Sequence, residues 1–326
     1  MLSRLPLALL GLVLLAGAAH SQPVPVPVPK PDMEAADSAD DNGGAPTPAA
    51  KPTAATLPPG KPAKEIFGAL AKPAADLAPR AIGSYAKGCL AGAVALPING
   101  ETWQVMRLSR NRNWGHPDLI ALLERLSKRM PQVAGWRGLL VGDIAQPRGG
   151  PMLTGHASHQ IGLDADVWLT EMPERKLSSG ERETMVPNNL VAADWNDVDP
   201  KTWKPEHLRV IKAAAQMPEV ARIFSNPAIK KALCREAGTD RAWLKKVRPT
   251  PGHNYHFHIR IRCPAGMAGC VDQTPPPDGD GCGKELDWWF SDEYRKPKKS
   301  KVPYKPPPPM TMDALPAACR TVATAP

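Results

Sequence analysis

Proline limits how much of this 326-residue chain can form a packed core. Eleven of its 39 prolines fall between Ser21 and Lys64, beginning with the repeat PVPVPVPKP, and a second run, PPPP, occupies residues 306–309. Proline fixes φ and has no backbone N–H, so such repeats favour extended polyproline II rather than a helix or sheet. About 215 residues of ordinary composition lie between these segments, enough for a single domain.

The first 21 residues have the pattern of a secretory signal peptide. Arg4 precedes the apolar run LPLALLGLVLLAGAA, and the small residues Ala19 and Ser21 follow it. The run is shorter than the ~20 residues that a transmembrane helix needs, which argues against a membrane anchor. We therefore expect an exported chain with four parts: a signal peptide (1–21), a Pro/Ala-rich disordered linker (22–80), a catalytic domain (81–296) and a Pro/Lys-rich tail (297–326).

Export changes the interpretation of the six cysteines and of the net charge of +9. Outside the cytoplasm an even number of cysteines indicates disulfides, and no two cysteines have the C-x2-C spacing of a zinc ribbon. Cys263 and Cys270 are close enough for a local bridge, while spacing leaves the other pairings open. A basic chain could bind nucleic acid. However, export and the lack of any nucleic-acid motif argue against such a partner.

Apolar spacing predicts the order of helices and strands. Residues 116–130 carry four leucines at helical spacing, Leu119, Leu122, Leu123 and Leu126, with Asp118 near the start. Further helices are expected at 204–217, 226–238 and 240–247, and a weak one at 65–78. Strands are expected at 135–147, 161–169 and 255–263. Because these elements interleave without a regular βαβ repeat, we expect an α+β domain with a central, mainly antiparallel sheet flanked by helices.

The last of these strands carries a cluster of histidines. Three of the chain's eight histidines lie within GHNYHFHIRIRC, residues 252–263 in this sequence. Side chains alternate along a strand, so one face carries His256, His258, Arg260 and Arg262, and the other carries Phe257, Ile259 and Ile261. The apolar face suits a core. The other face presents two imidazoles side by side, an arrangement typical of a metal ligand next to a general base.

A second cluster precedes the strand at 161–169. His156 and His159 lie on a glycine-flanked loop, and Asp164, Asp166 and Trp168 share one face of the strand. Carboxylates on such a face are costly unless they are paired or bind something. Imidazole and carboxylate are zinc ligands, and catalytic zinc sites keep an open position for water.

A histidine such as His156 or His253, taken alone, is more often structural than a metal ligand, but the clusters together predict a zinc site. Neither a G-x-S-x-G serine elbow nor an H-E-x-x-H zinc helix is present.

The segments GHASHQIGLDADVW and HNYHFHIRIRCP resemble the penicillin-insensitive murein endopeptidases. These are zinc peptidases of the group that includes lysostaphin, the D-Ala-D-Ala metallopeptidases and the hedgehog signalling domain. The resemblance covers roughly residues 82–290. It implies His159, Asp166 and His258 as zinc ligands, and a catalytic role for His256 with His253 nearby. Asp164 does not match a ligand and is expected to brace the loop or Gln160.

The resemblance also implies a second metal site and a disulfide pattern. His156 and Asp194 match residues of the second site, but Asp197 stands where the family has a histidine. A second metal ion is therefore doubtful. The implied disulfides are Cys89–Cys319, Cys234–Cys282 and Cys263–Cys270. The first of these would join the tail to the start of the domain.

The function that the resemblance implies is hydrolysis of D-alanyl–meso-diaminopimelyl cross-links in periplasmic peptidoglycan by a zinc-activated water. His256 would act as a base or as a donor to the oxyanion. Penicillin would not inhibit because no serine is acylated. Tyr255 replaces the glutamate base of D-Ala-D-Ala carboxypeptidase relatives, which favours an endopeptidase over that alternative. A non-catalytic, zinc-stabilised peptidoglycan-binding module is the other alternative, and His256 argues against it. Arg260 and Arg262 are expected either to meet substrate carboxylates or to be structural.

Overall fold

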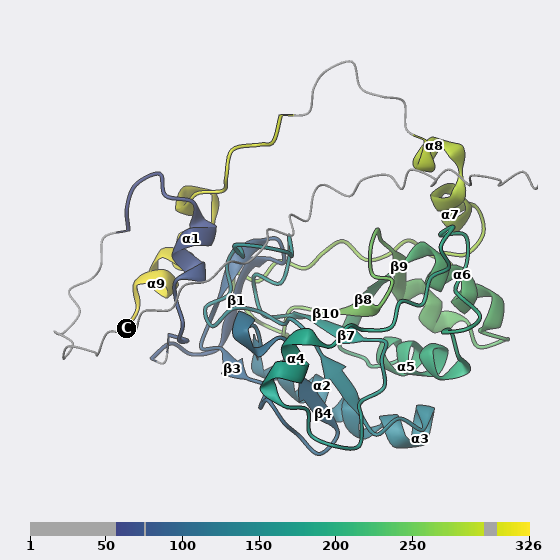
Figure 1. Ribbon diagram of the computed structural model, residues 1–326. Helices are drawn as coiled ribbons and strands as arrows, with labels where there is room; N and C mark the ends of the chain where they lie inside the picture. Colours follow the sequence, from purple (N-terminus) through teal and green to yellow (C-terminus); the bar gives the residue numbers. More distant parts are fainter. Residues whose placement is uncertain (1–56, 75, 297–304) are drawn as a thin grey trace, which may run out of the picture.

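The computed structural model describes residues 57–74, 76–296 and 305–326 (Figure 1). The expected signal peptide and most of the proline-rich segment lie outside these residues. Within them, every helix is too short or too polar to span a membrane.

A six-stranded mixed sheet forms the centre of the fold, in the order β4-β6-β7-β10-β8-β9. Its strands are β4 (Trp103–Val105), β6 (Leu139–Val141), β7 (Asp164–Trp168), β10 (His256–Ile261), β8 (Val220–Ser225) and β9 (Val247–Pro249). The four central strands pair antiparallel, and the two edge strands pair parallel with their neighbours. Two small antiparallel sheets accompany it: β1 (Arg80–Ser84) with β2 (Lys87–Ala91), and β3 (Val94–Ala95) with β5 (Trp114–Gly115). The expected α+β class is confirmed.

The apolar side of the central sheet packs against helices in one core. The helices of this region are α2 (Pro117–Lys128), α3 (Met130–Ala134), α4 (Ser179–Thr184), α5 (Pro205–Ala215) and α6 (Pro227–Glu236). The four leucines predicted for α2 are fully buried, as are Phe257 and Ile259 of β10. Proline begins α2, α5 and α6, where its missing N–H would have no partner in any case. Because this apolar side of β10 packs in the core, the site lies on the other side of the strand, which carries His256 and His258.

The helix expected at 240–247 is wrong. A short 3-10 helix, η2 (Ala242–Lys246), passes directly into β9. Val247 is fully buried and pairs with Ile223 of β8. Tertiary pairing at the sheet edge therefore overrides the local helical pattern, and Pro249 is tolerated because β9 is an edge strand. The remaining short elements are η1 (Leu108–Arg110), α7 (Lys284–Asp287), η3 (Trp288–Phe290), α8 (Asp292–Arg295) and η4 (Met312–Ala314).

A second, smaller core joins the two ends of the described chain. Helices α1 (Ala63–Gly68) and α9 (Ala318–Thr324) lie side by side next to the β1–β2 hairpin (Figure 1). A disulfide between Cys89 and Cys319 lies within this core. Phe67 of α1 is buried there. Of the weak helix expected at 65–78, only residues 65–68 are helical, as part of α1, and this short helix docks on the domain.

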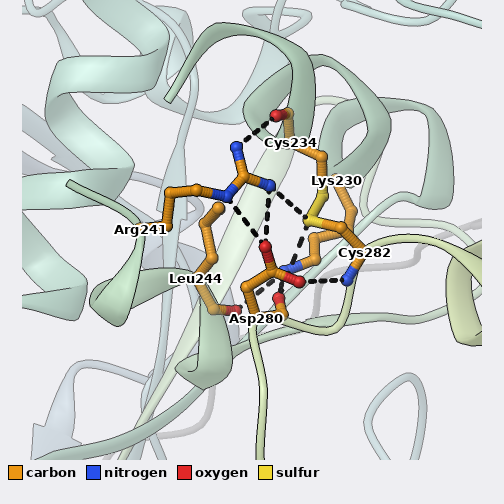
Figure 2. The surroundings of a disulfide bond; sticks show 6 residues. All are labelled: Lys230, Cys234, Arg241, Leu244, Asp280 and Cys282. Atoms are coloured by element: carbon orange, nitrogen blue, oxygen red, sulfur yellow. Dashed lines mark hydrogen bonds and ion pairs between the residues drawn. A yellow bond between two sulfur atoms is a disulfide. The ribbon is translucent and has the colours of Figure 1, made fainter. Parts of the chain in front are cut away.

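The other two disulfides are Cys234–Cys282 and Cys263–Cys270, so the three bridges are those implied by the resemblance. Figure 2 shows the surroundings of Cys234–Cys282. Lys230 of α6 is fully buried beside it and donates hydrogen bonds to the carbonyls of Leu244 (2.8 Å) and Asp280 (2.6 Å). Burial lowers the pKa of Lys230 to about 7.

Candidate metal centre

The register between β7 and β10 places the polar side chains of the two strands together. His258 lies opposite Asp166, and Arg260 lies opposite Asp164. Directly opposed residues of antiparallel strands point to the same face. The expectation that the HxH and DxD motifs meet on one side of the sheet is therefore confirmed.

His159 enters the same site from the loop before β7. Its backbone is left-handed (φ 66°), and its N–H donates to Asp164 Oδ2 at 3.0 Å. Its Nδ1 lies 2.5 Å from the carbonyl oxygen of Ile144. A carbonyl only accepts hydrogen bonds, so Nδ1 carries the proton and Nε2 offers a lone pair to the site.

Three donor atoms converge on one point. His159 Nε2 lies 3.3 Å from His258 Nδ1 and 3.5 Å from Asp166 Oδ1, and the third side of this triangle, His258 Nδ1 to Asp166 Oδ1, is 3.6 Å. Tetrahedral zinc with bonds of about 2.0–2.1 Å separates its ligand atoms by about 3.3–3.4 Å. Asp166 Oδ1 is buried without a hydrogen-bond partner among the described residues. A cation between the three atoms fits both observations.

Asp164 supports this triangle from behind. It is fully buried and accepts from Arg260 Nε (2.7 Å) and Nη2 (3.0 Å). Its Oδ1 also lies 3.0 Å from His258 Nε2. Burial alone would raise the pKa of Asp164, but Arg260 and His258 outweigh burial and hold it well below its usual range. A carboxylate behind a histidine fixes the ring and its tautomer, as in many metal sites.

Burial keeps the two β10 histidines neutral. It lowers the pKa of His258 to about 4 and that of His256 to about 3, although nearby carboxylates oppose the shift. His256 Nε2 lies 3.8 Å from Asp166 Oδ1. The ring of His253 lies 4.8 Å from that of His256, and its Nδ1 is 2.9 Å from the Pro251 carbonyl oxygen. Neutral imidazoles are the form that binds a metal ion or accepts a proton.

His156 completes a second triad that shares two members with the first. A donor atom each from His156, His159 and Asp166 lies within 4.8 Å of the others. His156 Nε2 is 3.4 Å from Asp166 Oδ2 and 3.0 Å from Asp143 Oδ2. Burial would lower the pKa of His156, but Asp166 and Asp143 outweigh it and raise the pKa above its usual value. The described residues thus contain a group that could hold a metal ion, with His156 facing two carboxylates.

Asp194 and Asp197 make other contacts. Asp194 accepts hydrogen bonds from the backbone and side chain of Asn196, and Asp197 pairs with Arg235 of α6 at 2.8 Å. Within the described ranges, no hydrogen bond or ion pair joins either carboxylate to the site histidines. Arg262 is exposed and donates to the Pro218 carbonyl.

Asp143 is part of the site but did not stand out in the sequence. It follows β6, is buried, and its Oδ2 accepts from Arg112 (2.8 Å) and Arg110 (3.2 Å) as well as facing His156. Its pKa is held well below the usual range because His156 and the two arginines outweigh burial. An acidic residue directly after the apolar stretch LLVG is the signal that could have indicated it.

Comparisons with known proteins agree with this geometry. Residues 81–324, which include every site residue above, match the family model described as penicillin-insensitive murein endopeptidase. The chain is therefore a peptide hydrolase. It is similar to the penicillin-insensitive murein endopeptidase of Haemophilus influenzae, with 50% identity over 230 residues that cover 70% of this chain and 79% of the relative.

Two further relatives carry the same name. The protein of Yersinia enterocolitica is 48% identical over 244 residues, covering 75% of this chain and 85% of its own. A protein of Escherichia coli is 46% identical over 243 residues, covering 74% and 85%. The chain belongs to the family of penicillin-insensitive murein endopeptidases.

Proposed function

We propose that this protein is a periplasmic zinc endopeptidase that hydrolyses D-alanyl–meso-diaminopimelyl cross-links in peptidoglycan. Peptidoglycan is proposed as the substrate because the family and the relatives are described as murein endopeptidases. The observation that carries the zinc assignment is the triangle of donor atoms from His159, Asp166 and His258, with sides of 3.3–3.6 Å.

These three residues would hold the ion through Nε2, Oδ1 and Nδ1 respectively. Zinc, when bound, supplies a Lewis acid that activates water and polarises a carbonyl. His156 is not part of this triangle, because its Nε2 contacts Asp143 Oδ2 (3.0 Å) and the other oxygen of Asp166, Oδ2 (3.4 Å). Its role is instead to bridge Asp143 to Asp166 and so fix the carboxylate of the ligand.

His256 moves the proton. Its ring is neutral, and Nε2 is the ring nitrogen 3.8 Å from Asp166 Oδ1, so this nitrogen faces the reacting centre. We assign to Nε2 the acceptance of a proton from the attacking water and its return to the leaving amine. The negative charge of Asp166, 3.8 Å away, favours the imidazolium that forms between these steps. The ring of His253 lies beside that of His256, with the centroids 4.8 Å apart.

This mechanism explains the family name in chemical terms. In the proposed reaction the nucleophile is water, and no serine is acylated. A β-lactam therefore finds no hydroxyl to acylate, and we expect activity in the presence of penicillin.

The test uses the mature chain and cross-linked sacculi. We expect about one zinc per chain and conversion of dimeric muropeptides to monomers, lost in His256→Ala. The matched control is His116→Asn, because His116 caps α2 outside the site and asparagine keeps a capping side chain. Free D-alanine as the only product would indicate a carboxypeptidase instead. Bound zinc without any product would indicate a binding module and contradict the proposal.

A further inference from the structure

Arg110 is a cation beside the site with most of its hydrogen-bond donors unused. Its side chain is 49% exposed, and its one hydrogen bond among the described residues joins Nη1 to Asp143 Oδ2 at 3.2 Å. Arg112 reaches the same oxygen at 2.8 Å, is only 9% exposed and also donates to Thr154. Asp143 thus has a buried counter-ion in Arg112. The edge of Arg110 formed by Nε and Nη2 remains available to a ligand.

The turn that carries Arg110 is held firmly. Arg110 ends η1, and the residues on either side of η1, Arg107 (φ 55°) and Asn111 (φ 51°), both have left-handed backbone. Two such residues in one turn are costly unless the surroundings fix them. Here the backbone and hydroxyl of Ser109 both donate to the Glu183 carboxylate at 2.9 Å. A turn fixed in this way presents the Arg110 side chain with little loss of backbone freedom on binding.

Arg110 lies on the open side of the metal centre. His159 is fully buried, whereas His156 is partly exposed and contacts the same Asp143 as Arg110. On the other flank Tyr255 is 38% exposed, with its ring 4.6 Å from that of His256. Burial and Asp166 raise the pKa of Tyr255, and Arg110 acts against them. The exposed side chains of Arg110 and Tyr255 thus both lie near the partly exposed edge of the site.

We propose that Arg110 is a specificity-determining residue that pairs with the substrate carboxylate next to the scissile amide. This inference rests on the proposed function. In a D-alanyl–diaminopimelyl cross-link, the scissile nitrogen is attached to a carbon that bears a free carboxylate. The D-alanine residue itself offers none, because its carboxyl group forms the amide. Guanidinium binds carboxylate through two parallel N–H···O bonds, and the free Nε–Nη2 edge has the required shape.

The test compares two synthetic cross-linked peptide dimers, one with that carboxylate free and one with it amidated. For the zinc-loaded wild type we expect kcat/KM to be about 10- to 100-fold higher on the free acid, the effect of a charge-assisted bond. Arg110→Gln should lose this preference because its kcat/KM falls on the free-acid dimer and stays unchanged on the amidated dimer. Arg110→Lys should keep part of the preference. Arg209→Gln is the matched control, because Arg209 is a half-exposed arginine with one ion pair on α5. Calorimetry measures the binding of both dimers to the His256→Ala protein, which should bind the free-acid dimer more tightly. The double variant Arg110→Gln/His256→Ala should bind the two dimers equally.

Two results would overturn the inference while leaving the proposed function intact. One is equal turnover of both dimers by the wild type. The other is an equal loss on both dimers in Arg110→Gln, which would show that Arg110 acts only by supporting Asp143. Absence of turnover on either dimer by the wild type would overturn the proposed function, and the inference with it.

Discussion

Asp164 and Arg260 form a buried bidentate ion pair across β7 and β10, and the same carboxylate lies 3.0 Å from the ring of His258. The guanidinium also stacks on Tyr85, 4.0 Å from the ring centroid. Stability and the orientation of a proposed metal ligand, His258, are therefore expected to depend on one carboxylate.

Asp164→Asn is expected to impair both properties. Loss of one partner leaves Arg260 as an unpaired buried cation, so we expect the free energy of unfolding to fall by about 3–5 kcal/mol. Loss of the carboxylate behind His258 should weaken zinc binding by about 10- to 100-fold. Denaturant unfolding and zinc titration measure the two effects. Arg262→Gln, at the exposed position directly after β10, should change neither, and normal zinc affinity in Asp164→Asn would contradict the assignment.

Zinc content distinguishes the two overlapping triads. We expect His258→Ala to lose stoichiometric zinc, because one corner of the 3.3–3.6 Å triangle disappears. His156→Ala should still bind one zinc per chain. Atomic absorption of dialysed protein gives the answer directly. The opposite pattern would place the ion between His156, His159 and Asp166 instead.

Lys230 gives the stability a pH dependence of known sign. Its pKa is about 7 in the folded chain and about 10.4 when unfolded, so between these values the unfolded state binds more protons. Stability should therefore rise with pH across this window. Lys230→Met removes this titrating group. The free energy of unfolding of the variant minus that of the wild type should therefore fall by about 2–4 kcal/mol from pH 7 to pH 10. Lys231→Met, its exposed neighbour on α6, is the control, and a pH-independent difference would refute the low pKa.

The Cys89–Cys319 bridge should stabilise the small core between α1, α9 and the β1–β2 hairpin. The double variant Cys89→Ser/Cys319→Ser is expected to lose about 2–5 kcal/mol of unfolding free energy. Hydrogen exchange should show faster opening of α9, while zinc content stays at one per chain because the site lies on other strands. Loss of zinc in this variant would show that the two regions are not independent.

The sequence predicted the parts of the site that follow from alternation along a strand. The two-residue period of a strand is enough to predict that His256, His258 and Arg260 share one face. The same period places Asp164 and Asp166 on one face of their own strand, and the register between the strands then brings the two faces together. The sequence did not predict Asp143 as a site residue, because its role depends on a tertiary contact between the end of β6 and His156. The helix expected at 240–247 is only a short 3-10 helix for a similar reason: its last residue, Val247, pairs with Ile223, a strand partner far away in the sequence.

The three disulfides are nested: the Cys263–Cys270 loop lies inside the Cys234–Cys282 loop, and both lie inside Cys89–Cys319. Cys89 emerges first during synthesis but must wait for a partner 230 residues further on. An oxidant that joined cysteines in order of emergence would couple Cys89 to Cys234 and Cys282 to Cys319. The native pairing therefore requires either that oxidation waits until folding has brought Cys89 and Cys319 together or that mispaired bridges are reshuffled by thiol–disulfide exchange.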